Sequence, residues 1–306
     1  MNRVLVIGAA GMIGRKLTAR LLKEGVGELI QQDVVPFEGT VSDLSAPGEA
    51  EKLIAKRPDL IFHLAAVVSG EAEADFDKGY RVNLDATRYL FEAIRKEGYK
   101  PKVVFTSSIA VFGAPFPEAI GDEFLNAPLT SYGTQKAIGE LLLSDYSRRG
   151  LFDGIGIRLP TICVRPGKPN KAASGFFSGI LREPLAGQEA VLPVPDTVRH
   201  WFASPRAAIE FLILASKINT ELLGTRRNLS MPGLSATVAE QIAALGRVAG
   251  DKATRLIRRE PDQTIMRIVE GWPRNFDARR ALSLGFRPDP SFDDIIRYHL
   301  QDELGR

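Results

Sequence analysis

Short apolar runs and amphipathic helical repeats alternate along the first half of the chain. The apolar runs predict buried strands at residues 3–8, 28–33, 60–65, 102–107 and 154–159. Apolar positions three or four residues apart predict helices at residues 12–25, 45–56, 75–96 and 131–149. We expect Ser45 to be the N-cap of the second helix, with Glu49 near the capping-box position, and Gly98 to end the third.

This alternation predicts an α/β fold, a doubly wound parallel sheet with helices on both faces. The pattern changes after Pro160, because prolines at 166, 169, 184, 193, 195 and 205 divide the chain into short segments. We therefore expect residues 1–164 to form the main domain and residues 165–306 to form a smaller α+β lobe that contributes substrate contacts. A predicted helix at residues 205–217 is expected to pack back on the first domain.

Composition excludes several classes of protein. Among the 306 residues, 40 Lys+Arg stand against 37 Asp+Glu, a formal charge of +3 that suits a small anionic substrate but does not indicate nucleic-acid binding. The single cysteine, Cys163, excludes an internal disulfide and leaves too few thiols for a structural zinc site, so we expect no metal. The first residues lack the features of a secretory signal, and apolar stretches fall short of the ~20 residues of a membrane span. We expect a cytoplasmic protein without a membrane partner.

A glycine-rich loop follows the first predicted strand and opens the first predicted helix. Gly8 allows a tight turn, Gly11 lets the backbone approach a pyrophosphate, and Gly14 lets the helix pack closely on the strand. The N–H groups at the helix start, in the region of Met12 and Ile13, would then meet the phosphates. This context predicts a Rossmann-like dinucleotide site, and a tight turn without a ligand is the alternative.

An acidic residue closes the second predicted strand. Asp33 lies 33 − 14 = 19 residues after the last glycine of the loop, the spacing at which a carboxylate accepts hydrogen bonds from the adenosine ribose. A carboxylate there would repel a 2′-phosphate, which favours NAD over NADP, although Arg15 lies nearby. Asp43 and Leu44 end the next short strand and are expected to border the adenine. A surface aspartate at a strand end is the alternative for Asp33.

Two hydroxyl groups and an amine form the candidate catalytic set. Tyr132 and Lys136 are four residues apart at the start of a predicted helix, so they share one face. A nearby ammonium and an oxidised nicotinamide would each lower the pKa of a tyrosine, which is about 10 for the free side chain. Ser107 and Ser108 end a strand, where ligands of open α/β sheets bind. A solvated Tyr–Lys pair and serines that only cap a loop are the alternatives.

The ordered set of these motifs resembles the extended short-chain dehydrogenase/reductase family, which includes NAD-dependent sugar epimerases and dehydratases. The resemblance covers nearly the whole chain. It rests on Gly8, Gly11, Gly14, Asp33, Asp43-Leu44, His63-Leu64-Ala65-Ala66, Asn83, residues 106–113, and Tyr132 with Lys136.

The resemblance implies a role for each matching position. Tyr132 would be the general acid/base, Lys136 its partner and ribose ligand, and Ser108 the catalytic serine. Asn83 would steady the site from the long helix, and we interpret His63 as structural. The implied backbone and side-chain contacts to the cofactor also include Leu64, Ala65, Ala66, Pro160 and Ile162.

Departures from the family pattern narrow the function. Ile109 and Ala110 occupy the positions where dehydratases carry an Asp-Glu pair, so a dehydratase is not expected. Thr161 replaces the asparagine that many sugar-nucleotide epimerases use to hold their substrate. The region 158–201 is more similar to D-erythronate dehydrogenases, members of the family that oxidise C2 of a four-carbon sugar acid.

A small anionic hydroxy acid needs a cation for its carboxylate and polar groups for its hydroxyls. Cations gather in the substrate-lobe segments at Arg165, Lys168, Lys171, Arg182 and Arg199. We choose Asn170 and Arg182 from this region as substrate ligands, together with Ser69, Ser108 and Tyr132.

The expected activity is NAD-dependent oxidation of the C2 hydroxyl of such an acid. The alternatives are a sugar-nucleotide epimerase and a sensor that binds NAD without turnover; the presence of both Tyr132 and Lys136 counts against the sensor. The resemblance also implies a homodimer. Its interface would use the long helix and the tyrosine-bearing helix, whose apolar candidates are Ile138, Leu141, Leu142 and Tyr146, although the same residues could face the sheet.

Overall fold

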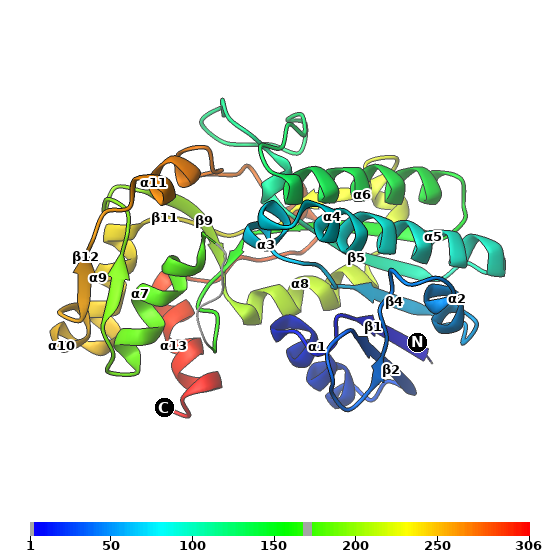
Figure 1. Cartoon of the computed structure of the whole chain (residues 1–306), viewed down its shortest axis with the longest axis horizontal. Helices are drawn as coiled ribbons and strands as arrows, with labels where there is room; N and C mark the ends of the chain where they lie inside the picture. Colours follow the sequence, from blue (N-terminus) through cyan, green and yellow to red (C-terminus); the bar gives the residue numbers. More distant parts are fainter. Residues whose placement is uncertain (1–2, 168–172) are drawn as a thin grey trace.

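The main lobe is built on one parallel sheet of seven strands. The computed structural model describes residues 3–167 and 173–306. The strand order is β10-β6-β5-β4-β1-β2-β3, and every neighbouring pair is parallel (Figure 1). The strands are β1 (Arg3–Ile7), β2 (Glu28–Asp33), β3 (Thr40–Val41), β4 (Leu60–His63), β5 (Lys102–Ser108), β6 (Asp153–Leu159) and β10 (Asn228–Ser230).

Both faces of the sheet are apolar, which is why the strands read as continuous hydrophobic runs. In β1, Val4 and Val6 join the core on one face, whereas Leu5 and Ile7 join the core on the other. The first face is covered by α1 (Met12–Lys23) and α8 (Pro205–Lys217). The second is covered by α2 (Glu49–Ile54), α5 (Ala86–Glu97) and α6 (Ser131–Arg148). The predicted doubly wound α/β fold is confirmed.

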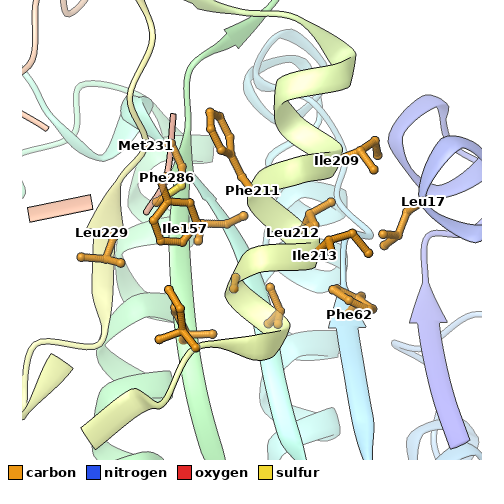
Figure 2. Packing of buried hydrophobic residues seen from close by; sticks show 14 of the residues in the cluster. Leu17, Phe62, Ile157, Ile209, Phe211, Leu212, Ile213, Leu229, Met231 and Phe286 are labelled. Carbon is orange, nitrogen blue, oxygen red and sulfur yellow. The ribbon is translucent and has the colours of Figure 1, made fainter. Parts of the chain in front are cut away.

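The chain returns to the main sheet after it has begun the second lobe. Helix α8 packs against the sheet through Leu212 and Ile213, which lie over Phe62 (Figure 2). Strand β10 then pairs with β6 and extends the sheet by one strand. The expected return of residues 205–217 is therefore present, and the return continues to residue 230. The division at residues 164 and 165 remains a prediction.

The second lobe combines small sheets with helices. Its two sheets have the orders β11-β9-β7 and β12-β8, and they enclose a separate apolar core. The strands are β7 (Thr161–Ile162), β8 (Ala190–Leu192), β9 (Arg199–Ala203), β11 (Leu234–Thr237) and β12 (Ile257–Arg259). The helices of this lobe are α7 (Gly175–Leu185), α9 (Val238–Ala249), α10 (Asp251–Thr254), α11 (Gln263–Glu270) and α13 (Phe292–Glu303). A 3₁₀ turn (Thr220–Leu223) and α12 (Arg279–Ser283) belong instead to the main lobe, because Leu223 and Ala281 join its core.

Two predicted helices differ from the structure. Ser45 is not an N-cap: α2 begins at Glu49, after Gly48 adopts a φ of +81°, a left-handed conformation that favours glycine. The helix predicted at residues 75–96 is divided into α4 (Phe76–Gly79), a π-helical turn at Tyr80–Asp85, and α5, and it is preceded by α3 (Ser69–Ala74). Gly98 ends α5 in the left-handed conformation, as predicted.

Within residues 3–167 and 173–306, no helix has both the length and the apolar character needed to cross a bilayer. Over the same residues, His, Cys, Asp and Glu side chains form no cluster of three or more that could hold a metal ion.

Candidate functional site

The glycine loop lies where β1 ends, directly beneath the loop that follows β4. Gly8 has a φ of +86°, and a Cβ built on it would meet the Ala65 nitrogen at 2.7 Å. A Cβ on Gly14 would meet the Gly8 oxygen at 2.1 Å, so α1 packs on the loop as closely as backbone allows. These are the two positions at which the predicted turn requires glycine.

The remaining glycine leaves room for a ligand. A Cβ on Gly11 would have the Gly8 oxygen, at 3.4 Å, as its one neighbour within 4 Å in the part of the chain that the structure describes. Gly11 is also the N-cap of α1, and it offers no side chain to the N–H groups of Met12 and Ile13. Open space above unsatisfied donors at a helix N-terminus fits a dinucleotide pyrophosphate. Which of these groups contact the cofactor stays a prediction.

The two aspartates lie beside this loop, each with protein partners. Asp33 accepts hydrogen bonds from the backbone nitrogens of Ala10 at 2.9 Å and Val34 at 2.7 Å, so its carboxylate is anchored at the edge of the loop. Asp43 accepts from the Ser45 hydroxyl at 2.6 Å and from Arg81 at 3.0 Å. Their contacts to ribose and adenine remain predictions. Leu44 is buried in the core beside them.

Ser108 and Tyr132 meet where β5 ends and α6 begins. Thr130 caps α6 by accepting a hydrogen bond from the Gly133 nitrogen at 3.0 Å, which places Tyr132 in the first turn. A Cβ on Gly133 would meet the Ala110 oxygen at 2.2 Å, so this turn lies against the loop that follows Ser108. The Ser108 side chain lies close enough to Tyr132 to lower the pKa of its hydroxyl group. The two hydroxyl groups that we predicted to be catalytic thus lie at the same edge of the sheet.

Lys136 lies one turn further along α6, beneath Tyr132. Its ammonium is 5.9 Å from the centre of the Tyr132 ring and donates a hydrogen bond to the Thr106 oxygen at 2.8 Å. Burial lowers the pKa of Lys136 to about 8, against the opposing effect of Glu140. The three candidate catalytic side chains thus lie at one edge of the sheet.

Two groups act on the Tyr132 hydroxyl against the effect of burial. Burial raises the pKa of Tyr132, and the Ser108 side chain and the Arg165 guanidinium oppose this rise. Arg165 is thus a second cation near Tyr132, beside the Lys136 ammonium, which is held by the Thr106 carbonyl at 2.8 Å. The effect of Lys136 on the pKa of Tyr132 stays a prediction.

Asn83 holds the site together from the π-helical turn. Its amide accepts from the Val67 nitrogen at 2.8 Å and donates to the Gln135 side chain at 2.7 Å. It therefore joins the loop after β4, which carries Leu64, Ala65 and Ala66, to the helix that carries Tyr132. An inserted π turn of this kind is frequent at functional sites because it re-aims a side chain. The steadying role implied by the resemblance fits these contacts, whereas direct contact with the cofactor stays a prediction.

His63 behaves as a structural side chain. It is 1% exposed, and its Nε2 lies 2.9 Å from the Thr87 hydroxyl. Burial, and to a smaller extent Lys136, lowers the pKa of His63 to about 3, so the imidazole is neutral at neutral pH. This is the interpretation that the sequence favoured.

A family model described as NAD dependent epimerase/dehydratase family matches residues 4–203, which include six of the seven strands of the main sheet and the residues Ser108, Tyr132 and Lys136. The chain belongs to this family. The NAD cofactor and the expectation of an enzyme are thereby confirmed, and the open glycine cradle fits that cofactor.

Full-length relatives in this epimerase/dehydratase family carry two kinds of name. The chain is 48% identical to a D-erythronate dehydrogenase from Cupriavidus necator, over 98% of both chains. It is 41% identical to a D-erythronate dehydrogenase from Haemophilus influenzae, over 99% of this chain and 100% of that one. A crystal structure described as the nucleoside-diphosphate-sugar epimerase from Agrobacterium tumefaciens is 66% identical, with a TM-score of 0.94 over 99% of this chain and 95% of the other.

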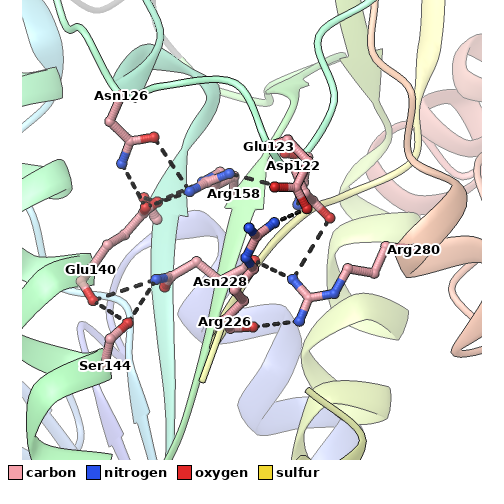
Figure 3. A network of polar contacts seen from close by, with 11 residues as sticks. Asp122, Glu123, Asn126, Glu140, Ser144, Arg158, Arg226, Asn228 and Arg280 are labelled. Atoms are coloured by element: carbon pink, nitrogen blue, oxygen red, sulfur yellow. Dashed lines mark hydrogen bonds and ion pairs between the residues drawn. The ribbon is translucent and has the colours of Figure 1, made fainter. Parts of the chain in front are cut away.

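A buried polar network supports the site, and the sequence analysis missed it. Glu140 accepts two hydrogen bonds from Arg158, at 2.9 and 2.8 Å (Figure 3). It accepts another from the Ser107 hydroxyl at 2.6 Å. It also accepts from Asn126 at 3.0 Å. A signal was present, because Glu140 continues the four-residue spacing of Tyr132 and Lys136 along one face of α6.

The predicted substrate residues are less well defined. Ser69 begins α3 in the loop after β4 and is half-buried. Asn170 lies outside the described residues. Arg182 donates to the Arg165 oxygen at 2.8 Å and pairs with Glu183 at 2.5 Å, so its guanidinium already has protein partners. The predicted cofactor contacts Pro160 and Ile162 follow the end of β6, where Leu159 is the strand partner of Ser108. The roles of all five remain predictions.

Proposed function

We propose that this chain is an NAD-dependent dehydrogenase that oxidises the C2 hydroxyl of D-erythronate or a closely related small sugar acid. The observation that carries the proposal is the likeness to D-erythronate dehydrogenases along the full length of both chains. The site supports it, because Ser108, Tyr132 and Lys136 converge at the sheet edge without a carboxylate at positions 109 and 110.

The proposed chemistry removes a proton from the hydroxyl and a hydride from C2, which leaves a 2-oxo acid. NAD, when bound, supplies the hydride acceptor and becomes NADH. Ser108 would hold the reacting oxygen, and Tyr132 would take its proton. Lys136 would hold the nicotinamide ribose. Because burial raises the pKa of Tyr132, the hydroxyl needs positive charge nearby to ionise, and an oxidised nicotinamide carries such a charge.

The alternative is a sugar-nucleotide epimerase of the same family. It is favoured by the name of the 66% identical structure. The residue at position 161 argues against the epimerase. Many sugar-nucleotide epimerases use an asparagine there to hold the diphosphosugar, whereas this chain has Thr161, whose hydroxyl lies 2.7 Å from His200 Nε2. An epimerase would return its hydride to the sugar and release no NADH.

The decisive experiment follows NADH formation from NAD and D-erythronate. We expect the wild type to form NADH, and Tyr132→Phe to lower kcat by about 100- to 10,000-fold while NAD binding persists. Tyr298→Phe, on α13 in the second lobe, is the matched control and should retain activity.

Absence of NADH formation with D-erythronate and with other aldonates would end the proposal. Conversion of UDP-glucose to UDP-galactose without net NADH would establish the epimerase instead.

We also propose that the enzyme acts as a homodimer in the cytoplasm. On α6, Leu141 is 69% exposed and supports an intermolecular contact, whereas Leu142 and Tyr146 pack against the core of this chain. Sedimentation should give a dimer at micromolar concentration, and Leu141→Glu should weaken it. A monomer at that concentration would refute the dimer and leave the catalytic proposal intact.

A further inference from the structure

A guanidinium beside the catalytic hydroxyls has no carboxylate partner within 4.0 Å among the described residues. Arg165 is half-buried and lies just after β7, on the segment that continues from the end of β6. Its Nε donates to the Ile162 oxygen at 3.1 Å, and a terminal nitrogen donates to the Ser174 hydroxyl at 2.6 Å. Both acceptors are neutral, so these contacts orient the guanidinium without cancelling its charge.

The backbone of Arg165 is held firmly by α7. Its nitrogen donates to the Ser178 hydroxyl at 3.0 Å, and its oxygen accepts from Arg182 at 2.8 Å. Arg182 differs from Arg165 because it forms an ion pair with Glu183 at 2.5 Å. Of these two arginines, Arg165 is the one whose charge is available to a ligand.

The backbone places Arg165 at the sheet edge that carries the reacting hydroxyl groups. Leu159, the last residue of β6, is the strand partner of Ser108, and the Arg165 guanidinium is held at the Ile162 oxygen three residues further along. Its charge acts on Tyr132. It also acts on His200, on the neighbouring strand β9, although burial is the larger cause that lowers the pKa of His200 to about 3. Because that imidazole is neutral at neutral pH, it adds no competing charge to the space beside Tyr132.

We propose that Arg165 binds the carboxylate of the substrate while Ser108 and Tyr132 hold its C2 hydroxyl. This inference rests on the proposed function. In a 2-hydroxy acid the carboxylate is bonded to the carbon that is oxidised, so the group that holds it must lie next to the group that takes the proton. A guanidinium matches a carboxylate with two parallel hydrogen bonds.

The assignment also explains how one site would distinguish two substrate classes of this fold. The reacting carbon of a UDP-hexose carries no carboxylate, so Arg165 would remain buried without a counter-ion in that complex, at a cost in binding. With a small sugar acid the same arginine is neutralised. Arg165 would therefore be a specificity-determining residue.

The test compares D-erythronate with its carboxamide, D-erythronamide, which keeps the C2 hydroxyl and lacks the charge. For Arg165→Met we expect kcat/KM with D-erythronate to fall by about 100-fold and kcat/KM with the amide to change by less than about threefold. Arg165→Lys should retain part of the activity with the acid, because an ammonium keeps the charge but loses the bidentate geometry. The control is Arg259→Met, which removes an exposed arginine of β12 that pairs with Asp196. This variant should behave as wild type.

A binding measurement covers the case in which the amide is too slow to assay. D-erythronate should bind to the enzyme–NADH complex at least about tenfold more weakly in Arg165→Met than in wild type, with NADH affinity unchanged. If Arg165→Met lowers the rates with acid and amide by the same factor, or leaves the affinity for D-erythronate unchanged, the assignment is wrong. If the wild type oxidises no aldonate, the proposed function fails first, and the two failures are distinct.

Discussion

The buried charge of Lys136, a proposed catalytic residue, lowers the stability of the folded protein. The side chain is 3% exposed, and burial lowers its pKa from 10.5 to about 8. A difference of that size corresponds to about 3 kcal/mol of folding free energy at neutral pH. The ammonium keeps a hydrogen bond to the Thr106 oxygen at 2.8 Å and lies 4.9 Å from the centre of the Phe105 ring. The charge is thus present at a net cost, as expected of a group that serves function rather than folding.

Replacing Lys136 by Met should raise the Tm of the cofactor-free protein at pH 7 and lower turnover by at least about 100-fold. The folded pKa lies below the unfolded one, so the unfolded state binds more protons between pH 8 and 10.5 and the ammonium is destabilising below that range. The gain in Tm should therefore be largest below pH 8 and shrink as the pH approaches 10.5. Thermal unfolding at pH 7 and pH 10 checks this.

Lys52→Met is the control, because the Lys52 side chain is 72% exposed. An equal gain in Tm at both pH values for Lys136→Met would mean that shape, and not charge, explains the effect.

At the scale of elements, the pair formed by Glu140 and Arg158 joins α6 to β6. Their side chains are 2% and 8% exposed, and Asn228 on β10 reaches the Glu140 backbone oxygen at 3.4 Å (Figure 3). Ser107, the neighbour of Ser108, binds the same carboxylate. The network therefore ties β5 and α6, the elements that carry the proposed catalytic hydroxyls, to β10 at the edge of the sheet.

Glu140→Gln should destabilise the protein by up to about 3–5 kcal/mol, because the buried Arg158 guanidinium loses the carboxylate 2.8 Å away and keeps only the longer contact with Asp122 at 3.7 Å. The double variant Glu140→Met/Arg158→Met should lose less stability than the single variants Glu140→Met and Arg158→Met lose together. Urea unfolding of the wild type, these two single variants and the double variant forms a double-mutant cycle, which gives the coupling energy of the pair. Additive effects would show that the ion pair is not the stabilising unit.

The elements that sequence predicts well are those with long periodic patterns. Strands β1, β2, β4, β5 and β6 lie within about two residues of their predicted bounds. In β1, β4, β5 and β6 the reason is a largely apolar run buried on both faces, whereas β2 has polar residues at most positions. Strand β10 was not predicted, since three residues, Asn228–Ser230, carry no period to detect. The π turn at Tyr80–Asp85 was read as ordinary helix because one inserted residue hardly changes the apolar pattern.

In the candidate site, too, the residues that form local sequence motifs could be predicted, whereas contacts between distant segments could not. The glycine loop and the pair of Tyr132 and Lys136 are local in sequence, so their spacing reveals them. The partners of Arg182 and Arg165 depend on how α7 packs on the segment after β7, which no short motif encodes. For the same reason the sequence could not tell that the charge of Arg165 acts on Tyr132.

At the scale of the whole molecule, buried neutral histidines occur in both lobes. His63 and His200 are 1% and 3% exposed, and burial lowers the pKa of each to about 3. Their folded pKa values lie below the ordinary value of 6.5, so each contributes stability that is present above pH 6.5 and is lost as the pH falls toward 3. Both lobes should therefore weaken together in mild acid.

The free energy of unfolding should fall between pH 7.5 and pH 5, by about 2 kcal/mol for each of these histidines. His200→Gln keeps a side chain able to reach Thr161 and should reduce that fall by about the same amount. Urea titrations at the two pH values provide the measurement. An unchanged pH dependence in His63→Gln and His200→Gln would assign acid sensitivity to other groups.

The late return of the chain to the main sheet has a consequence for biosynthesis. A nascent chain that has left the ribosome as far as residue 164 still exposes the edge of β6, and its sheet lacks the cover that α8 provides over Phe62. Translation must proceed beyond residue 230 before that edge is sealed by β10. A gene fragment cut between the lobes would thus yield an incomplete, aggregation-prone product, however natural the cut looks in the primary structure.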